Sequence, residues 1–267
     1  MIVEARPSAT ICVLRDGLDG LEVLMVRRSL SARFMAGAWV FPGGVVEEFD
    51  EPLGFVEKND ATRPSEIAWA RAGLRELAEE VNIWITTELF VPPIERVQDA
   101  EVYTVMADSA VDFDIAKTTY FSNWITPTII PLRFDTRFFA VLASRDMCPD
   151  PNPEELDAVQ WITPRQALDS AAVGRMTLAL PTSKVLELFN EYRRVGDFLV
   201  FAQSVEEVHP VMARGRILED GSVEALLPDD PGYDDLDGNS VRMRQISRSA
   251  RFLIQQGYID EVISDEN

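Results

Sequence analysis

The chain has 267 residues and a formal net charge of −20 at pH 7. Such an acidic chain repels nucleic-acid phosphates over long range, so we expect no nucleic-acid partner. Hydrophobic residues make up 46% of it, enough for a sizeable core, and no apolar run is long enough to span a bilayer. We therefore expect a soluble, cytoplasmic protein with no membrane partner.

The histidine and cysteine content narrows the chemistry. The chain has one histidine, His209, and two cysteines, Cys12 and Cys148, far apart in the sequence. This argues against histidine-based catalytic triads and against zinc-type sites. Any hydrolysis is therefore expected to depend on carboxylates and a metal ion.

The N-terminal part of the chain predicts a β-hairpin. Residues 9–14 and 21–26 are apolar and β-branched, with two Asp-Gly pairs between them. A short apolar stretch at 39–41 then leads to Pro42 and a glycine pair, Gly43 and Gly44. Two adjacent glycines allow close approach of the backbone to a ligand, or unusual dihedral angles.

A long helix is predicted to begin near residues 62–65, after a polar loop that starts at residue 51. Its apolar stripe should pack on a sheet and comprises Ile67, Ala70, Leu74, Ala78 and Val81. Glu76, Glu79 and Glu80 lie mostly off this stripe, so we expect them to face a cleft or solvent.

The three glutamates stand at positions i, i+3 and i+4, on one helix face. Like charges so placed repel, and a divalent cation would convert the repulsion into a binding site suited to Mg2+ or Mn2+. Arg75 is spaced to pair with Glu79. The competing interpretation is an ordinary solvated helix face with a surface ion pair.

Further elements are predicted along the remaining chain. They are a helix at 98–107, strands at 120–130, 137–143 and 159–162, a helix from 163 to about 170, a helix from 181, and short strands within 208–227.

The glycine pair and the glutamate helix together resemble the signature of the Nudix hydrolases, G-x5-E-x7-R-E-U-x-E-E-x-G-U, where U is bulky and apolar. The matching residues are Gly44, Arg75, Glu76, Leu77, Glu79, Glu80 and Ile83. Asp50 replaces the first Glu, and Asn82 replaces the closing Gly, which Asn can do because it tolerates the left-handed conformation. Residues 51–74 form an insertion where the signature has seven residues.

The resemblance implies a Nudix-type α/β/α sandwich with a mixed central sheet, followed by a C-terminal α+β extension. The division expected is a Nudix domain at 1–175, with the insertion at 51–74, and an extension at 176–267 packed on it. A split signature of this kind resembles the coenzyme A diphosphatase branch of the family.

The resemblance also implies roles for individual residues. Metal ligands would be Glu76, Glu79, Glu80 and the carbonyl of Gly44 or Gly43, holding Mg2+ or Mn2+. Asp50 would brace Arg75. Glu76 or an acid from a later loop would activate water. Glu154 and Glu155 stand in the loop where the family often has such a base. For these two residues, a role only in keeping the loop soluble is an equal alternative.

The implied substrate is a nucleotide with a diphosphate. Arg27, Arg28 and Arg33 resemble the basic segment before the signature in coenzyme A diphosphatases. The resemblance implies that these arginines, together with Gly43 and Gly44, bind the substrate. The alternative for the arginines is an ordinary charged strand end. The expected products are 3′,5′-ADP and (acyl-)4′-phosphopantetheine. Hydrolysis of ADP-ribose, NADH or a related dinucleotide, and a catalytically silent ligand-sensing module, stay open, as does a homodimer.

Overall fold

The computed structural model describes residues 3–32, 35–52, 64–128, 130–144, 147–217 and 223–233. The chain divides into two compact units. The larger comprises Pro7–Phe121 and Arg137–Glu206, and the smaller comprises Met1–Arg6, Ser122–Thr136 and Glu207–Asn267.

A mixed sheet has the strand order β3-β2-β1-β6-β5-β8, with β4 paired to β1 and β7 paired to β2. Its strands are β1 (Arg6–Asp16), β2 (Leu21–Arg28), β3 (Trp39–Val40), β4 (Gly43–Val45), β5 (Thr119–Ile125), β6 (Phe134–Leu142), β7 (Leu156–Ile162) and β8 (Pro210–Met212). β1 and β2 form the predicted antiparallel hairpin, whereas β8 runs parallel to β5.

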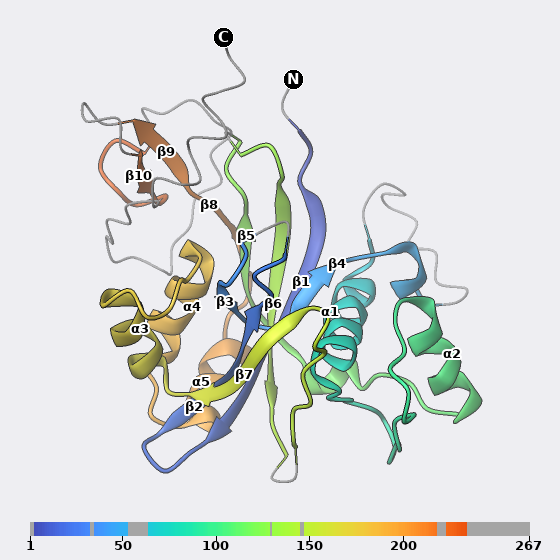
Figure 1. The fold of residues 1–267 in the computed structure, drawn as a ribbon. Helices are drawn as coiled ribbons and strands as arrows, with labels where there is room; N and C mark the ends of the chain where they lie inside the picture. The colour runs from blue at the N-terminus through green and yellow to red at the C-terminus, as the bar shows by residue number, and fades with distance from the viewer. Residues whose placement is uncertain are drawn as a thin grey trace. The chain divides into compact units, whose positions relative to one another are not determined.

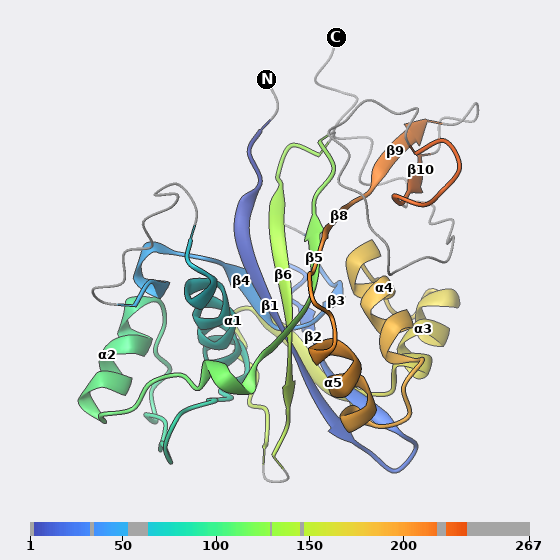
Figure 2. The ribbon, with the colours of Figure 1, turned by 180° about the vertical axis from the view of Figure 1, so that it is seen from behind.

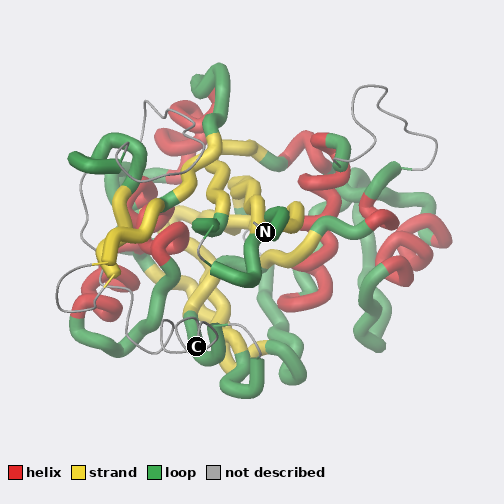
Figure 3. The backbone as a smooth tube through the Cα atoms, turned by 90° about the horizontal axis from the view of Figure 1, so that it is seen from above, coloured by secondary structure: helices red, strands yellow, loops and turns green. Residues whose placement is uncertain are grey.

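Helices cover both faces of this sheet. They are α1 (Glu66–Val81), α2 (Ala100–Asp108), α3 (Pro164–Ala172), α4 (Leu180–Phe189) and α5 (Val195–Gln203). Figure 1 shows α1 and α2 on one side of the sheet and α3, α4 and α5 on the other, and Figure 2 shows the same layers from behind. Seen from above in Figure 3, the central strands run between the two groups of helices. The predicted α/β/α sandwich with a mixed sheet is confirmed.

Helix α1 has defined ends. The Ser65 hydroxyl caps its start by accepting a hydrogen bond from the backbone N–H of Ala68 at 3.1 Å, so Pro64 precedes the cap and is not in the first turn as predicted. At its end Asn82 takes the left-handed conformation, with φ 54° and ψ 35°. Asn82 therefore does what the signature glycine would do, as predicted.

The core has a part on each face of the sheet. On the α1 side, Ile11 and Val13 of β1 belong to the same buried cluster as Leu74 and Leu77 of α1. A Cβ on Gly73 would collide with Ile11, so α1 approaches β1 closely where this glycine stands. On the other side, aromatic rings of β5, α4 and α5 pack together, namely Phe121, Phe189 and Phe198.

Helices α4 and α5 belong to the larger unit, together with β1 and β2. The boundary predicted at residue 175 would assign them to an extension, and α5 itself has no counterpart among the predicted elements. The ring contacts explain their position: the centroids of Phe189 and Phe198 are 4.8 Å apart, and Val195 and Phe198 are fully buried.

The smaller unit contains β8 and a two-stranded sheet of β9 (Arg214–Ile217) and β10 (Val223–Leu226). The short strands predicted within 208–227 are thus present. Of the insertion predicted at 51–74, residues 53–63 lie outside the described residues, and residues 66–74 form the first half of α1. None of the described helices is long and apolar enough to cross a membrane.

Candidate active site

The glycine pair lies directly against α1. The backbone N–H of Gly43 donates to Glu80 Oε2 at 3.2 Å, and a Cβ on Gly44 would collide with the carboxylate of Glu76. The pair forms strand β4, and neither glycine has a positive φ. Close approach, and not an unusual dihedral angle, therefore explains both glycines, because a Cβ on Gly43 would collide with Ala9 of β1.

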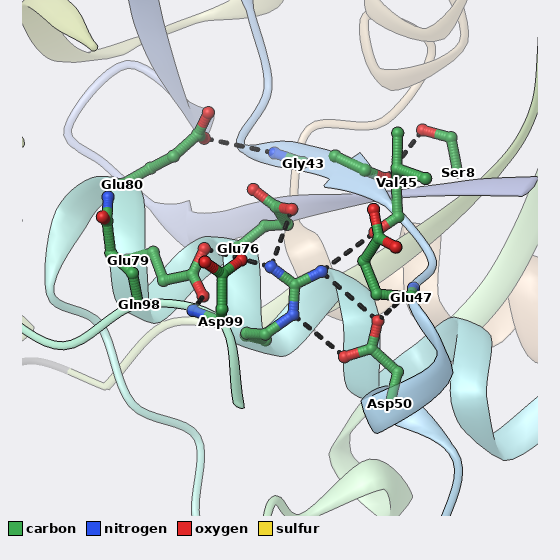
Figure 4. Close-up of polar contacts among 12 residues, drawn as sticks. Ser8, Gly43, Val45, Glu47, Asp50, Glu76, Glu79, Glu80, Gln98 and Asp99 are labelled. Atoms are coloured by element: carbon green, nitrogen blue, oxygen red, sulfur yellow. Dashed lines mark hydrogen bonds and ion pairs between the residues drawn. The ribbon is translucent and has the colours of Figure 1, made fainter. Parts of the chain in front are cut away.

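Arg75 joins the two halves of the motif. Its Nε donates to Asp50 Oδ1 at 2.9 Å, and its Nη2 donates to the carbonyl oxygen of Val45 at 2.9 Å. Its Nη1 donates to Glu76 Oε1 at 2.9 Å and to Glu79 Oε2 at 3.0 Å. Figure 4 shows Asp50 on one side of these contacts, which are drawn as dashed lines, and Glu76 and Glu79 on the other. Both contacts expected of Arg75, with Asp50 and with Glu79, are present.

The three glutamates are less accessible than predicted. Glu79 is 8% exposed, Glu80 is 3% exposed, and the Glu76 side chain is 16% exposed. The three glutamates therefore do not stand on an open, solvated helix face, because the glycine pair lies against this face of α1. Burying carboxylates together is costly unless opposite charge compensates them.

The pKa values reflect this cost. Burial raises the pKa of Glu76 to about 7, against an opposing effect of Arg75 and with further repulsion from Glu79 and Glu155. Burial, together with repulsion from Glu76 and Glu155, also raises the pKa of Glu80 well above its ordinary value. Glu76 and Glu80 are thus two buried carboxyl groups whose ionised forms repel each other.

Glu79 differs from the other two because both its oxygens are held by the protein. Oε2 accepts from Arg75, and Oε1 accepts from the backbone N–H of Asp99 at 2.7 Å. Figure 4 shows the Glu79 side chain directed toward Asp99 and that of Glu80 directed toward Gly43. Of the three glutamates, Glu79 is therefore the most firmly fixed in place.

Glu155 lies close enough to Glu76 and Glu80 for its charge to raise both of their pKa values. The loop before β7 is anchored at the end of α1, where the backbone N–H of Asn152 donates to the carbonyl oxygen of Glu80 at 2.7 Å. The Glu154 side chain is exposed. Within the described residues, Glu154 makes one hydrogen bond, from its backbone N–H to Asn152 Oδ1. Of the two candidate bases, the structure brings Glu155 to the glutamates.

The predicted substrate-binding arginines lie at the end of β2. Arg28 is near enough to Glu80 for its charge to lower the pKa of that carboxyl. Arg27 Nη2 is 3.8 Å from Asp157 Oδ2, and the neighbouring Ser29 donates its backbone N–H to the carbonyl oxygen of Glu155 at 2.8 Å. Arg33 lies outside the described residues.

The predicted metal site can be compared with these positions. Among the described residues, no group of three or more His, Cys, Asp or Glu side chains is arranged to hold a metal ion. The donor chemistry nonetheless fits Mg2+, which binds through one or two carboxylates and keeps water and phosphate oxygens as its other ligands. Glu76 and Glu80 would supply these carboxylates, and a cation would neutralise their buried like charges.

Four further residues contact the site and carry no recognisable sequence signal. Gln98, Tyr103 and Asn152 hold carboxylates by side-chain hydrogen bonds, and Ser8 Oγ donates to the carbonyl oxygen of Gly44 at 2.8 Å. The contacts of Gln98, Tyr103 and Ser8 join residues 57, 53 and 36 positions apart, so no local spacing could have indicated them. Asn152 and Glu155, in contrast, are only three positions apart.

The fold and site together define an α/β/α sandwich in which buried glutamates of one helix meet a glycine strand. A family model described as the NUDIX domain matches residues 5–181, more than half of the chain. The chain belongs to the Nudix family.

Relatives and solved structures agree. Nudix hydrolase 7 of Caenorhabditis elegans is 31% identical over 181 residues, which cover 62% of this chain and 54% of that protein, so the chain spans about half of this relative. The acyl-coenzyme A diphosphatase NUDT19 of Xenopus laevis is 24% identical, over 91% of this chain and 80% of that protein. A crystal structure of a Nudix hydrolase from Alicyclobacillus acidocaldarius has a TM-score of 0.65 and 25% identity, covering 77% of this chain and 98% of that one. The domain and these relatives indicate a hydrolase of pyrophosphate bonds.

Proposed function

We propose that this protein is a Mg2+- or Mn2+-dependent hydrolase of a nucleoside diphosphate linked to another group, and that the substrate is coenzyme A or acyl-coenzyme A. The observation that carries the proposal is the buried pair Glu76 and Glu80 beside the Gly43–Gly44 strand. Buried carboxylates that repel each other have a clear use if a divalent cation and a diphosphate join them.

In this reaction water adds to one phosphorus of the diphosphate and the bridging P–O bond breaks. The bound cation would neutralise charge on the phosphate oxygens. Glu155 would accept the proton of the attacking water, since it is exposed at the edge of the site while its charge reaches both buried glutamates. Arg75 and Asp99 would keep Glu79 in position, and the carbonyl of Gly44 would face the cation.

Two observations favour coenzyme A within this class. Arg28 and the segment around Ser29 lie beside Glu80 and Glu155. Coenzyme A carries a 3′-phosphate in addition to its diphosphate, so basic residues next to the site have a use. The frog relative that aligns with 91% of this chain is named an acyl-coenzyme A diphosphatase.

A substrate panel tests the proposal. The full chain is incubated with Mg2+ or Mn2+ and, separately, with coenzyme A, an acyl-coenzyme A, dephospho-coenzyme A, ADP-ribose and NADH, and products are identified by mass. The proposal predicts 3′,5′-ADP and 4′-phosphopantetheine or its acyl form. Preference for ADP-ribose or NADH would contradict the proposal that coenzyme A is the substrate. Inactivity across the panel would contradict the proposal that the protein is a hydrolase of such compounds.

A further inference from the structure

Three site carboxylates from three different parts of the chain are held by one short segment. We define the positioning segment as Gln98–Tyr103, which leads into α2 and forms its first turn. Its contacts reach Glu155 in the loop before β7, Glu79 on α1, and Asp50 at the end of the 3-10 helix Glu48–Asp50.

The first contact is made by Gln98. Its Nε2 donates to Glu155 Oε1 at 2.9 Å, and Asn152 Nδ2 reaches the same oxygen at 3.3 Å. Within the described residues both donors use Oε1, which leaves Oε2 to accept from water. An amide pair that occupies one oxygen therefore fixes the direction in which the other faces.

The second contact is made by the backbone of Asp99. Its N–H donates to Glu79 Oε1 at 2.7 Å, while its own φ of 55° and ψ of −136° are a combination that glycine adopts readily and other residues rarely do. Such conformations cost about 1–3 kcal/mol and persist where the surroundings impose them. Here the imposed conformation directs the N–H at a site carboxylate.

The third contact is made by Tyr103. Its hydroxyl donates to Asp50 Oδ1 at 2.6 Å, the oxygen that also accepts from Arg75. Asp50 is 0% exposed, so this hydroxyl is part of the small set of groups that satisfy a buried carboxylate. Through Asp50, Tyr103 also fixes the guanidinium that holds Glu76 and Glu79.

We propose that Gln98–Tyr103 is a positioning segment that sets the separation between the proposed metal ligands and the proposed base, with Gln98 acting through Glu155 and Tyr103 acting through Asp50 and Arg75. Neighbouring residues of one short segment hold carboxylates of separate elements, so the segment ties these elements together. Site groups must be fixed to within about 0.5 Å to act together. The proposal rests on the proposed function for the roles of Glu155 and the cation.

Metal binding tests the Tyr103 contact without any turnover. Mn2+ is titrated into the full chain by calorimetry, comparing wild type with Tyr103→Phe, which keeps the ring and removes only the hydroxyl. We expect the dissociation constant for Mn2+ to rise about tenfold, as losing a partner of a ligand-holding group typically does. The control is Tyr192→Phe, which should leave the dissociation constant unchanged, because the Tyr192 ring packs on Phe198 of α5 on the other face of the sheet. Equal binding by wild type and Tyr103→Phe, or equal weakening in the control, would overturn this arm.

Steady-state kinetics with coenzyme A and Mg2+ test the Gln98 contact. Gln98→Ala should lower kcat about tenfold with KM within about twofold, because orientation of the base is lost and substrate contacts remain. In a Glu155→Gln background the same change should have no further effect, which separates action through Glu155 from a general loss of structure. Gln203→Ala, an exposed glutamine at the end of α5, is the matched control.

The outcomes separate the two proposals. An equal loss from Gln98→Ala in both backgrounds, or none in either, overturns the role of Gln98 and leaves the proposed function standing. Full activity of Glu155→Gln removes the base of the proposed function and the Gln98 arm with it. The Mn2+ titration still decides the Tyr103 arm in that case, because it needs no turnover.

Discussion

Asp50 and Arg75 form an ion pair that is closed off from water, with Arg75 Nε 2.9 Å from Asp50 Oδ1 and the two side chains 0% and 2% exposed. Asp50 precedes the segment 53–63 and Arg75 lies in the middle of α1, so this pair closes the split motif. The shorter Asp reaches the guanidinium here, with Tyr103 donating to the same oxygen.

Asp50→Asn should destabilise the protein by about 3–5 kcal/mol, because it breaks a buried ion pair and takes a fully buried counter-charge from the Arg75 guanidinium. The free energy of unfolding from urea titration measures this. Asp112→Asn is the matched control, since Asp112 pairs with Arg71 but its side chain is 58% exposed, and there a loss of about 1 kcal/mol or less is expected. Similar losses of unfolding free energy at the two positions would contradict the larger contribution to stability expected of the buried pair.

Gly44→Ala should reduce kcat with coenzyme A at least about tenfold while the protein stays folded, because the new methyl group would occupy the position of the Glu76 carboxylate. Gly196→Ala in α5 is the control, since a Cβ there meets nothing within 4 Å. Circular dichroism checks the fold of both. Unchanged activity in Gly44→Ala would show that the exact position of Glu76 is unimportant.

The pKa of Glu76, raised by burial to about 7, makes a prediction about stability in chelator. Because the folded state then binds the proton more tightly than the unfolded state, this group's contribution to stability is present below pH of about 4.3 and is lost as the pH rises to about 7. The melting temperature of Glu76→Gln, which cannot ionise, should therefore rise relative to that of the wild type as the pH increases from 5 to 7.5. Saturating Mn2+ should reverse the order at pH 7.5.

The exposed Glu101→Gln serves as the control for the loss of one carboxylate from the surface of α2. A difference between Glu76→Gln and wild type that stays constant over this pH range would contradict the raised pKa.

Replacing Arg27 and Arg28 together by Ala should raise KM for coenzyme A more than KM for dephospho-coenzyme A, because only the former carries the 3′-phosphate that these residues are proposed to bind. Arg165→Ala with Arg175→Ala, at exposed positions around α3, removes the same charge elsewhere. Equal changes for the two substrates would contradict a role in 3′-phosphate binding.

Local signals in the sequence were sufficient for much of the fold. The hairpin of β1 and β2, the start of α3 at Thr163, and the left-handed Asn82 all follow from residue types within a few positions of each other. The burial of Glu79 and Glu80 could not be predicted from local signals, because it depends on β4 and on residues 96–99, which come from other parts of the chain.

The same limit applies to the candidate site. The spacing of the signature residues indicated Arg75 and the glutamates, but Gln98 and Tyr103 act through contacts with residues distant in sequence. Helices α4 and α5 join the larger unit through ring packing with Phe121, which helical periodicity alone does not reveal. Tertiary contacts decided each of these cases.

The turnover of Glu80→Gln with coenzyme A and saturating Mg2+ tests the central claim most directly, since Glu80 is buried, lies against Gly43 and forms the like-charge pair with Glu76. Gln keeps the shape and can still accept from Gly43, while it removes the charge that would bind the cation. We predict that kcat falls at least about a hundredfold while the melting temperature in chelator is maintained. Near-normal turnover by the folded variant would contradict a carboxylate-held metal at this site.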